Sequence, residues 1–213
     1  MAMDLSISLV LGYFLGAIPI GIIAGRAFAG IDPREVGSRN IGFTNVLRVA
    51  GKTAGIVTLI GDMGKGALAI FLAHVLMGPA AGDTILAAGA AAILGHMFPV
   101  FLRFKGGKGV ATALGVMLAI EPAIGGCLVA VWLTSAAIWR MSSVAALIAF
   151  GSLPLWVWIF HATTPMAAFA TGITMLIVYR HRENISRLRA GTESKFGQRT
   201  STQGITTAPR NIS

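Results

Sequence analysis

The sequence contains little cysteine and few charged residues. A single cysteine, Cys127, stands within an apolar run of the 213-residue chain, which excludes a disulfide framework and a zinc or iron–sulfur centre held by thiolates. Charged residues make up 12% of the chain, against roughly 25% in an average soluble domain. The composition therefore excludes an ordinary soluble globular domain.

Apolar residues account for 55% of the chain, and the mean hydropathy is +0.77. They form runs suited to crossing a hydrocarbon core about 30 Å thick. Seven runs predict membrane-spanning helices: residues 5–25, 55–77, 84–102, 110–120, 123–139, 144–160 and 163–179. The run 110–120 is shorter than the about 20 residues that a spanning helix needs, so five or six full crossings remain an alternative. We expect an all-α integral membrane protein, a compact bundle of about seven transmembrane helices, some of them short.

The 17 basic residues predict how the bundle is oriented. With seven spans, all of them except Lys65 fall in loops or a tail on one face, whereas the opposite face carries Asp4, Asp83 and Glu121. The positive-inside rule then places the amino terminus outside and the carboxyl terminus in the cytoplasm. We expect residues 1–190 to form the transmembrane domain. Residues 191–213 lack the apolar residues needed to fold alone, which predicts a flexible cytoplasmic tail.

The formal net charge of +9 indicates anionic partners. No block of Lys and Arg is long enough to favour nucleic acid, so the positive charge points to anionic ligands or lipid headgroups. The positions of these charges are therefore more informative than their sum.

A first polar cluster occupies residues 37–48, with the sequence GSRNIGFTNVLR. Its two glycines, two Asn, two Arg, Ser and Thr allow backbone and side-chain donors to converge on an anion. The alternative is an ordinary polar loop whose Arg side chains face lipid phosphates.

A second cluster occupies residues 95–112, with the sequence GHMFPVFLRFKGGKGVAT. Glycines allow close approach to a ligand, Lys108 supplies a charge, and a helix beginning at Val110 would present free amides to a phosphate. The spacing of a Walker motif is missing here and at residues 61–66, which argues against a nucleotide-driven pump. The alternative is a membrane-surface belt of Lys and Arg.

A third cluster occupies residues 180–193, with the sequence RHRENISRLRAGTE. In a helix, His181 and Asn184 lie three residues apart on one face, so both can point into the same site. Asp62 and Lys65 stand in the apolar run 55–77, where each charge costs roughly 2.5–3.5 kcal/mol at mid-bilayer. Their spacing permits a mutual salt bridge; a structural pair and a direct role in the site both stay open.

These clusters, in this order and at these helix ends, resemble the acyl-phosphate-dependent glycerol-3-phosphate acyltransferases of bacterial membranes. The resemblance covers about residues 5–197 and includes the pattern of Asp62, Lys65 and Gly66. It implies a bundle of seven helices in the inner membrane, with the active site at the cytoplasmic face. It also implies transfer of a fatty acyl group from acyl phosphate to the 1-hydroxyl of glycerol 3-phosphate. The products are lysophosphatidic acid and inorganic phosphate, in the first acylation of phospholipid synthesis.

The resemblance carries the family's functional residues onto this sequence. It predicts a catalytic set of Arg48, Lys108, His181 and Asn184. It predicts substrate binding by Ser38, Asn40, Thr44, Asn45, Gly106, Gly107 and Gly109. The sequence departs from the family pattern at two positions, with Arg39 where a glycine is expected and Phe43 where a small alanine is expected.

The residues fit that reaction on separate grounds. Two phosphorylated substrates, one with a long chain, require neighbouring cationic sites beside a lipid-accessible groove. Because acyl phosphate is already activated, orientation and stabilisation of the leaving phosphate can suffice. This agrees with the lack of a G-x-S-x-G nucleophile elbow. The proton of the glycerol hydroxyl goes to His181 or to a phosphate oxygen, and the sequence leaves both open.

No cofactor or metal ion is expected, because no carboxylates converge on the cytoplasmic face. The expected partners are acyl phosphate, glycerol 3-phosphate and membrane lipid; the oligomeric state stays open. One alternative is a small transporter for an organic phosphate, although no internal repeat is evident. Another is a non-catalytic membrane subunit that grips anionic lipid.

Overall fold

The computed structural model describes residues 2–78, 82–160 and 163–197, and every regular element within these residues is a helix. The elements are α1 (Ala2–Ala17), α2 (Ile20–Ala29), α3 (Phe43–Met77), α4 (Gly82–Met97), the short 3₁₀ helix η1 (Val100–Leu102), α5 (Val110–Ile120), α6 (Pro122–Trp139), α7 (Ser142–Gly151), α8 (Leu153–Phe160), α9 (Thr164–Arg180) and α10 (Arg182–Arg189). The prediction of an all-helical membrane bundle is confirmed.

Each predicted apolar run corresponds to one helix or to a helix broken near a proline. The first run is divided into α1 and α2 at Pro19, and the sixth into α7 and α8 just before Pro154. Proline lacks an amide hydrogen and disfavours a helical conformation in the residue before it, so a break at these places is expected. Within the described residues, five helical segments are long and apolar enough to cross a membrane, while α5 and α9 are shorter. Seven crossings and the orientation of the termini stay predictions.

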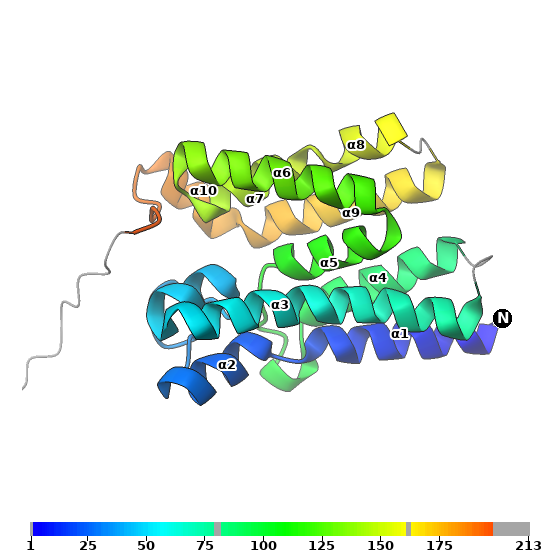
Figure 1. Ribbon diagram of the computed structural model, residues 1–213, viewed down its shortest axis with the longest axis horizontal. Coiled ribbons are helices and arrows are strands. Elements are labelled where there is room, and N and C mark those ends of the chain that lie inside the picture. The colour runs from blue at the N-terminus through cyan, green and yellow to red at the C-terminus, as the bar shows by residue number, and fades with distance from the viewer. Residues whose placement is uncertain (1, 79–81, 161–162, 198–213) are drawn as a thin grey trace, which may run out of the picture.

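The helices form two layers (Figure 1). Helices α1 to α4 lie in one layer and α6 to α9 in the other, with α5 between them. Within the first layer α1 packs along α4. Helix α5, between the layers, packs directly on α3. A Cβ atom at Gly66 would overlap the carbonyl oxygen of Thr112, and one at Gly115 would overlap that of Met63. Small residues therefore allow the backbones of α3 and α5 to approach closely.

The core between the layers is apolar. Ile70 of α3, Met117 of α5, Leu128 of α6 and Phe150 of α7 are all buried in one continuous cluster. Many large apolar side chains on the outside remain exposed, among them Trp158, which is 72% exposed. A surface of this kind suits contact with lipid and would be unfavourable in water.

Helix α3 is bent near its beginning. Gly51 has φ 87° and ψ 178°, values outside the helical region, so residues 43–50 form a short arm before the long spanning part. The prediction started this helix at residue 55, because the polar residues before it hide the arm in a hydropathy profile. The arm carries Thr44, Asn45 and Arg48 at the end of the bundle where α2 and α10 also lie (Figure 1).

Candidate active site

A cavity of about 890 Å³ opens at the end of the bundle that carries α10 and the arm of α3. Nine of the predicted site residues line it: Ser38, Asn40, Thr44, Asn45, Arg48, Lys108, Gly109, His181 and Asn184. The structure thus brings together residues from all three sequence clusters.

The amide of Asn45 organises the loop between α2 and α3. Its Nδ2 donates to the carbonyl oxygens of Pro33 at 2.9 Å, Val36 at 3.2 Å and Asn40 at 2.9 Å. Its Oδ1 accepts the amide hydrogen of Ser38 at 2.9 Å. Because this side chain is 2% exposed and engaged at both ends, it holds Ser38 and Asn40 in place at the cavity wall.

Two other predicted residues, Thr44 and Arg48, lie on the arm of α3 and line the cavity. Thr44 Oγ1 lies 2.7 Å from Ser142 Oγ at the start of α7, so this contact ties the two layers together beside the cavity. Arg48, one turn along the arm, lines the same cavity. Arg39, which replaces an expected glycine, has φ 57°. That left-handed conformation explains the preference for glycine at this position.

Lys108 lies at the centre of a polar network with the residues of α10. Its Nζ donates to Asn184 Oδ1, and Asn184 Nδ2 donates to Glu193 Oε1 at 2.6 Å. Glu193 Oε1 also accepts from Ser143 Oγ at 2.7 Å, while its Oε2 pairs with Arg187 Nε at 2.7 Å. Burial lowers the pKa of Lys108 to about 8. The ammonium group is therefore mostly charged at neutral pH and less hydrated than usual, which suits an anion-binding group.

His181 is a buried, neutral imidazole. Its Nδ1 lies 2.8 Å from the carbonyl oxygen of Ile177, one turn earlier in α9. Since a carbonyl only accepts hydrogen bonds, Nδ1 carries the proton and Nε2 is left as the acceptor. Burial first, and the positive charge of Lys108 second, lower the pKa of His181 to about 4. The ring can orient a hydroxyl group at neutral pH but holds a proton poorly.

Gly106 and Gly107, predicted to bind substrate, lie outside the cavity lining. Their amides donate instead to the carbonyl oxygens of Met97 at 3.2 Å and His96 at 3.0 Å. Their own carbonyl oxygens accept from Arg180 Nη2 at 2.7 Å and Nε at 3.0 Å. In this structure these two glycines therefore shape the loop that carries Lys108. Gly109, with φ 82°, does line the cavity and begins α5.

Apolar side chains from α3, α5 and α6 also line the cavity: Leu59, Met63, Leu114, Val129, Trp132 and Leu133. One cavity therefore has both a cationic, hydrogen-bonding lining and an apolar lining. Among the described residues, no three His, Cys, Asp or Glu side chains come together as a metal site would require.

Several residues that line the cavity were not predicted from the sequence. Glu193, Ser194 and Phe196 line the cavity, although no structure was expected from residue 191 onward. The amide of Phe196 donates to the Arg140 carbonyl oxygen at 2.6 Å, and its ring meets Trp132. Glu193 and Phe196 are therefore half-buried against the site, while residues 198–213 lie outside the described part and the flexible tail stays a prediction. Ser142 and Ser143 were also missed; a Ser pair two residues after Arg140 in a predicted cytoplasmic loop was the available signal.

Fold and cavity together define an integral membrane protein with a cavity that has both cationic and apolar walls. The chain belongs to the glycerol-3-phosphate acyltransferase family, whose sequence pattern matches residues 6–191, and it is an acyltransferase. A glycerol-3-phosphate acyltransferase of Jannaschia sp. (strain CCS1) is 50% identical over 198 residues, 92% of this chain and 95% of the relative. One of Bordetella pertussis (strain Tohama I / ATCC BAA-589 / NCTC 13251) is 44% identical over 200 residues, 90% of this chain and 91% of the relative.

Two solved structures share this fold. Both are crystal structures of PlsY (YgiH), an integral membrane glycerol 3-phosphate acyltransferase. Its glycerol 3-phosphate form matches with a TM-score of 0.85 and 39% identity, over 91% of this chain and 96% of that one. Its lysophosphatidic acid form matches with a TM-score of 0.83 and 38% identity, over 91% and 95%. These relatives favour the acyltransferase over the transporter and the non-catalytic subunit.

Proposed function

We propose that this protein transfers a fatty acyl group from acyl phosphate to the 1-hydroxyl of glycerol 3-phosphate, giving lysophosphatidic acid and inorganic phosphate. The observation that carries the proposal is the lining of the cavity. Its cationic side chains suit two phosphate groups, and its apolar side chains suit an acyl chain. Relatives crystallised in glycerol 3-phosphate and lysophosphatidic acid forms support the acceptor and the product.

Arg48 and Lys108 bind the phosphate groups in this scheme, and Ser38, Thr44 and the amide at Gly109 add hydrogen bonds. The acceptor hydroxyl oxygen attacks the carbonyl carbon of acyl phosphate. A carbon–oxygen bond forms to glycerol 3-phosphate, and the bond between the carbonyl carbon and the phosphate oxygen breaks. The cations stabilise the departing phosphate, so binding and orientation supply most of the catalysis.

The hydroxyl proton goes to the departing phosphate. His181 has a pKa of about 4 and stands beside Lys108, so an imidazolium would be unfavourable there. A phosphate monoester has a second pKa near 6 (about 6 in phosphoserine), which makes a phosphate oxygen the better acceptor. His181 Nε2 then accepts a hydrogen bond from the hydroxyl group and orients it, and Asn184 holds Lys108 in place.

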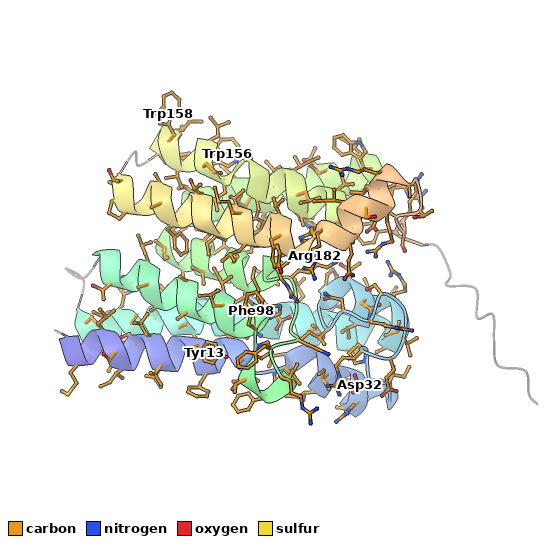
Figure 2. All side chains as sticks on the ribbon, turned by 180° about the vertical axis from the view of Figure 1, so that it is seen from behind. Tyr13, Asp32, Phe98, Trp156, Trp158 and Arg182 are labelled. Atoms are coloured by element: carbon orange, nitrogen blue, oxygen red, sulfur yellow. The ribbon has the colours of Figure 1, made fainter. Side chains whose placement is uncertain are left out.

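The site faces the cytoplasm in this proposal. Arg182 and Asp32 lie at the cavity end of the bundle, and Trp158 lies toward the other end (Figure 2). Arg26, Arg34 and Lys108 also belong to the cavity end. The positive-inside rule orients this end toward the cytoplasm, and the proposal takes the membrane to be the bacterial inner membrane.

The test is phosphate release by detergent-purified protein given palmitoyl phosphate, with and without glycerol 3-phosphate, and with acyl-CoA as a control donor. We expect release that requires glycerol 3-phosphate and is matched by lysophosphatidic acid, with full activity in excess chelator. Product from acyl-CoA alone would overturn the proposed donor. No product from either donor, with folded protein, would favour transport and call for uptake assays.

Variants connect the activity to the site. Arg48→Ala and Lys108→Ala should each abolish transfer while leaving folded protein in the membrane. Lys105→Ala, in the same loop as Lys108, and Arg182→Ala are matched controls, because neither residue lines the cavity. Unchanged turnover in both site variants would contradict the assignment.

A further inference from the structure

Three ionisable residues, Asp62, Lys65 and His96, meet inside the bundle, and Asp62 and His96 also line the cavity. Lys65 Nζ lies 2.9 Å from Asp62 Oδ1 and donates to the carbonyl oxygen of Ile18 at 2.9 Å, at the break between α1 and α2. His96 Nδ1, on α4, lies 3.5 Å from the same Asp62 oxygen. Asp62 and His96 are 1% and 4% exposed. The cluster therefore connects α3, α4 and the break after α1.

The His96 ring stands directly against the loop that carries Lys108. A Cβ atom built at Gly107 would lie 2.8 Å from His96 Cε1, 3.0 Å from Cδ2 and closer still to Nε2. These three ring atoms are the nearest that such a Cβ would meet. The Gly107 amide also donates to the His96 carbonyl oxygen at 3.0 Å. His96 itself therefore demands glycine at position 107.

The ion pair is not fully satisfied by protein groups. Asp62 Oδ2 and His96 Nδ1 are both buried without a hydrogen-bond partner, although Asp62 and His96 belong to the cavity wall. The approach of His96 Nδ1 to Asp62 Oδ1 at 3.5 Å is therefore an electrostatic contact and not a hydrogen bond. A buried carboxylate kept only for stability would have partners on both oxygens, because an unsatisfied polar atom is unfavourable. This favours a role connected with the site.

We propose that Asp62 and His96 are positioning residues: Asp62 holds the His96 ring against Gly107, and the ring fixes the backbone from which Lys108 reaches the cavity. Gly107 is then a glycine because of a neighbouring side chain and not because a substrate touches it. The inference rests on the proposed function only through the assay that reads it out.

A double-mutant cycle tests the contact. Gly107→Ala should lower kcat/KM by about a hundredfold, the scale expected for a misplacement of about 1 Å at a catalytic group. In a His96→Ala background, which removes the ring, the same methyl group should change kcat/KM by less than about threefold, because interacting residues are non-additive. If Gly107→Ala lowered kcat/KM equally in both backgrounds, or in neither, the proposal would be overturned. An equal loss is what a contact between the new methyl group and the substrate would give.

A second cycle tests Asp62. Asp62→Asn should lower kcat/KM less in the His96→Ala background than in the wild-type background, because the part of its effect that acts through the ring is then absent. The loss caused by leaving Lys65 unpaired is common to both backgrounds and cancels in the cycle. Independent losses would refute the link between the two residues. Should His96→Ala fail to give folded protein, His96→Asn replaces it, since the smaller amide also vacates the space of the ring while remaining polar.

Matched controls separate positioning from general damage. Gly172→Ala adds a methyl group where nothing lies within 4 Å, and His74→Ala removes an exposed histidine elsewhere in the bundle. Both should leave kcat/KM unchanged. If the wild-type protein used a different acyl donor, the proposed function would be contradicted. Both double-mutant cycles could still be completed by measuring kcat/KM with that other donor. The two failures are therefore distinguishable.

Discussion

Glu193 offers a quantitative test of how the segment after α10 closes the site. Its carboxylate is 8% exposed and accepts hydrogen bonds from Ser143 and Asn184 in addition to its pair with Arg187. Hydrogen bonds to a charged group contribute about 1.5–3 kcal/mol each, so losing two at the lower end costs about 3 kcal/mol. Arg187 is 37% exposed, and a pair of this kind adds at most about 1 kcal/mol.

Two substitutions separate these contributions. Glu193→Ala removes every contact and should destabilise the packed segment by about 3 kcal/mol or slightly more. Glu193→Gln keeps an oxygen for Ser143 and Asn184 and loses the ion pair with Arg187, so its cost should be about 1 kcal/mol or less. The alanine variant should also lower kcat/KM, because Asn184 would no longer be anchored beside Lys108.

The assay is amide hydrogen exchange over residues 191–197 in detergent. A loss of about 3 kcal/mol corresponds to exchange faster by about a hundredfold, and about 1 kcal/mol to roughly fivefold. Glu35→Ala, an exposed acidic residue outside the cavity lining, is the control and should change nothing. Equal effects of Ala and Gln, or unchanged exchange in the alanine variant, would show that the carboxylate does not hold this segment.

Three further predictions concern single residues. The pKa of Lys108 is lowered to about 8, so Lys108 loses its charge as the pH rises through that value. In pH–rate profiles kcat/KM should therefore fall on the alkaline side. An active Lys108→Arg variant should not show this fall. Arg39→Gly should raise the free energy of unfolding by about 1 kcal/mol, because Arg39 is exposed with φ 57° and a left-handed backbone is costly for residues other than glycine. An unchanged midpoint of thermal unfolding would contradict this prediction. Gly109→Ala should destabilise by about 1–3 kcal/mol at its φ of 82°, measured in the same way.

Hydropathy was sufficient to predict the apolar helices, since each apolar run corresponds to one helix or to a pair of helices separated by a break. It missed the arm at residues 43–50, because a short polar helix has no apolar run, and its bend depends on the one backbone conformation at Gly51. The three polar clusters were correctly expected to converge: Ser38, Lys108 and His181 line one cavity.

The individual roles within the clusters were harder to predict. Substrate binding by Gly107 stays a prediction, but the structure also places this glycine against the His96 ring, a contact between distant segments. Glu193 ends the third cluster but was given no role, because its partner Ser143 comes from another part of the chain. Spacing along the chain reveals neighbours on one helix, and it cannot reveal contacts of this kind.

The spacing of Asp62 and Lys65 also has a consequence for how the protein enters the membrane during synthesis. The two charges lie on the same helix at 2.9 Å, so α3 carries its own counter-charge before α4 has been made. An unpaired charge would cost roughly 2.5–3.5 kcal/mol at mid-bilayer. The carbonyl oxygen that also binds Lys65 belongs to Ile18, in a segment synthesised earlier. Insertion of α3 therefore never depends on His96, and a charge-reversing substitution at either residue should impair membrane integration before it affects catalysis.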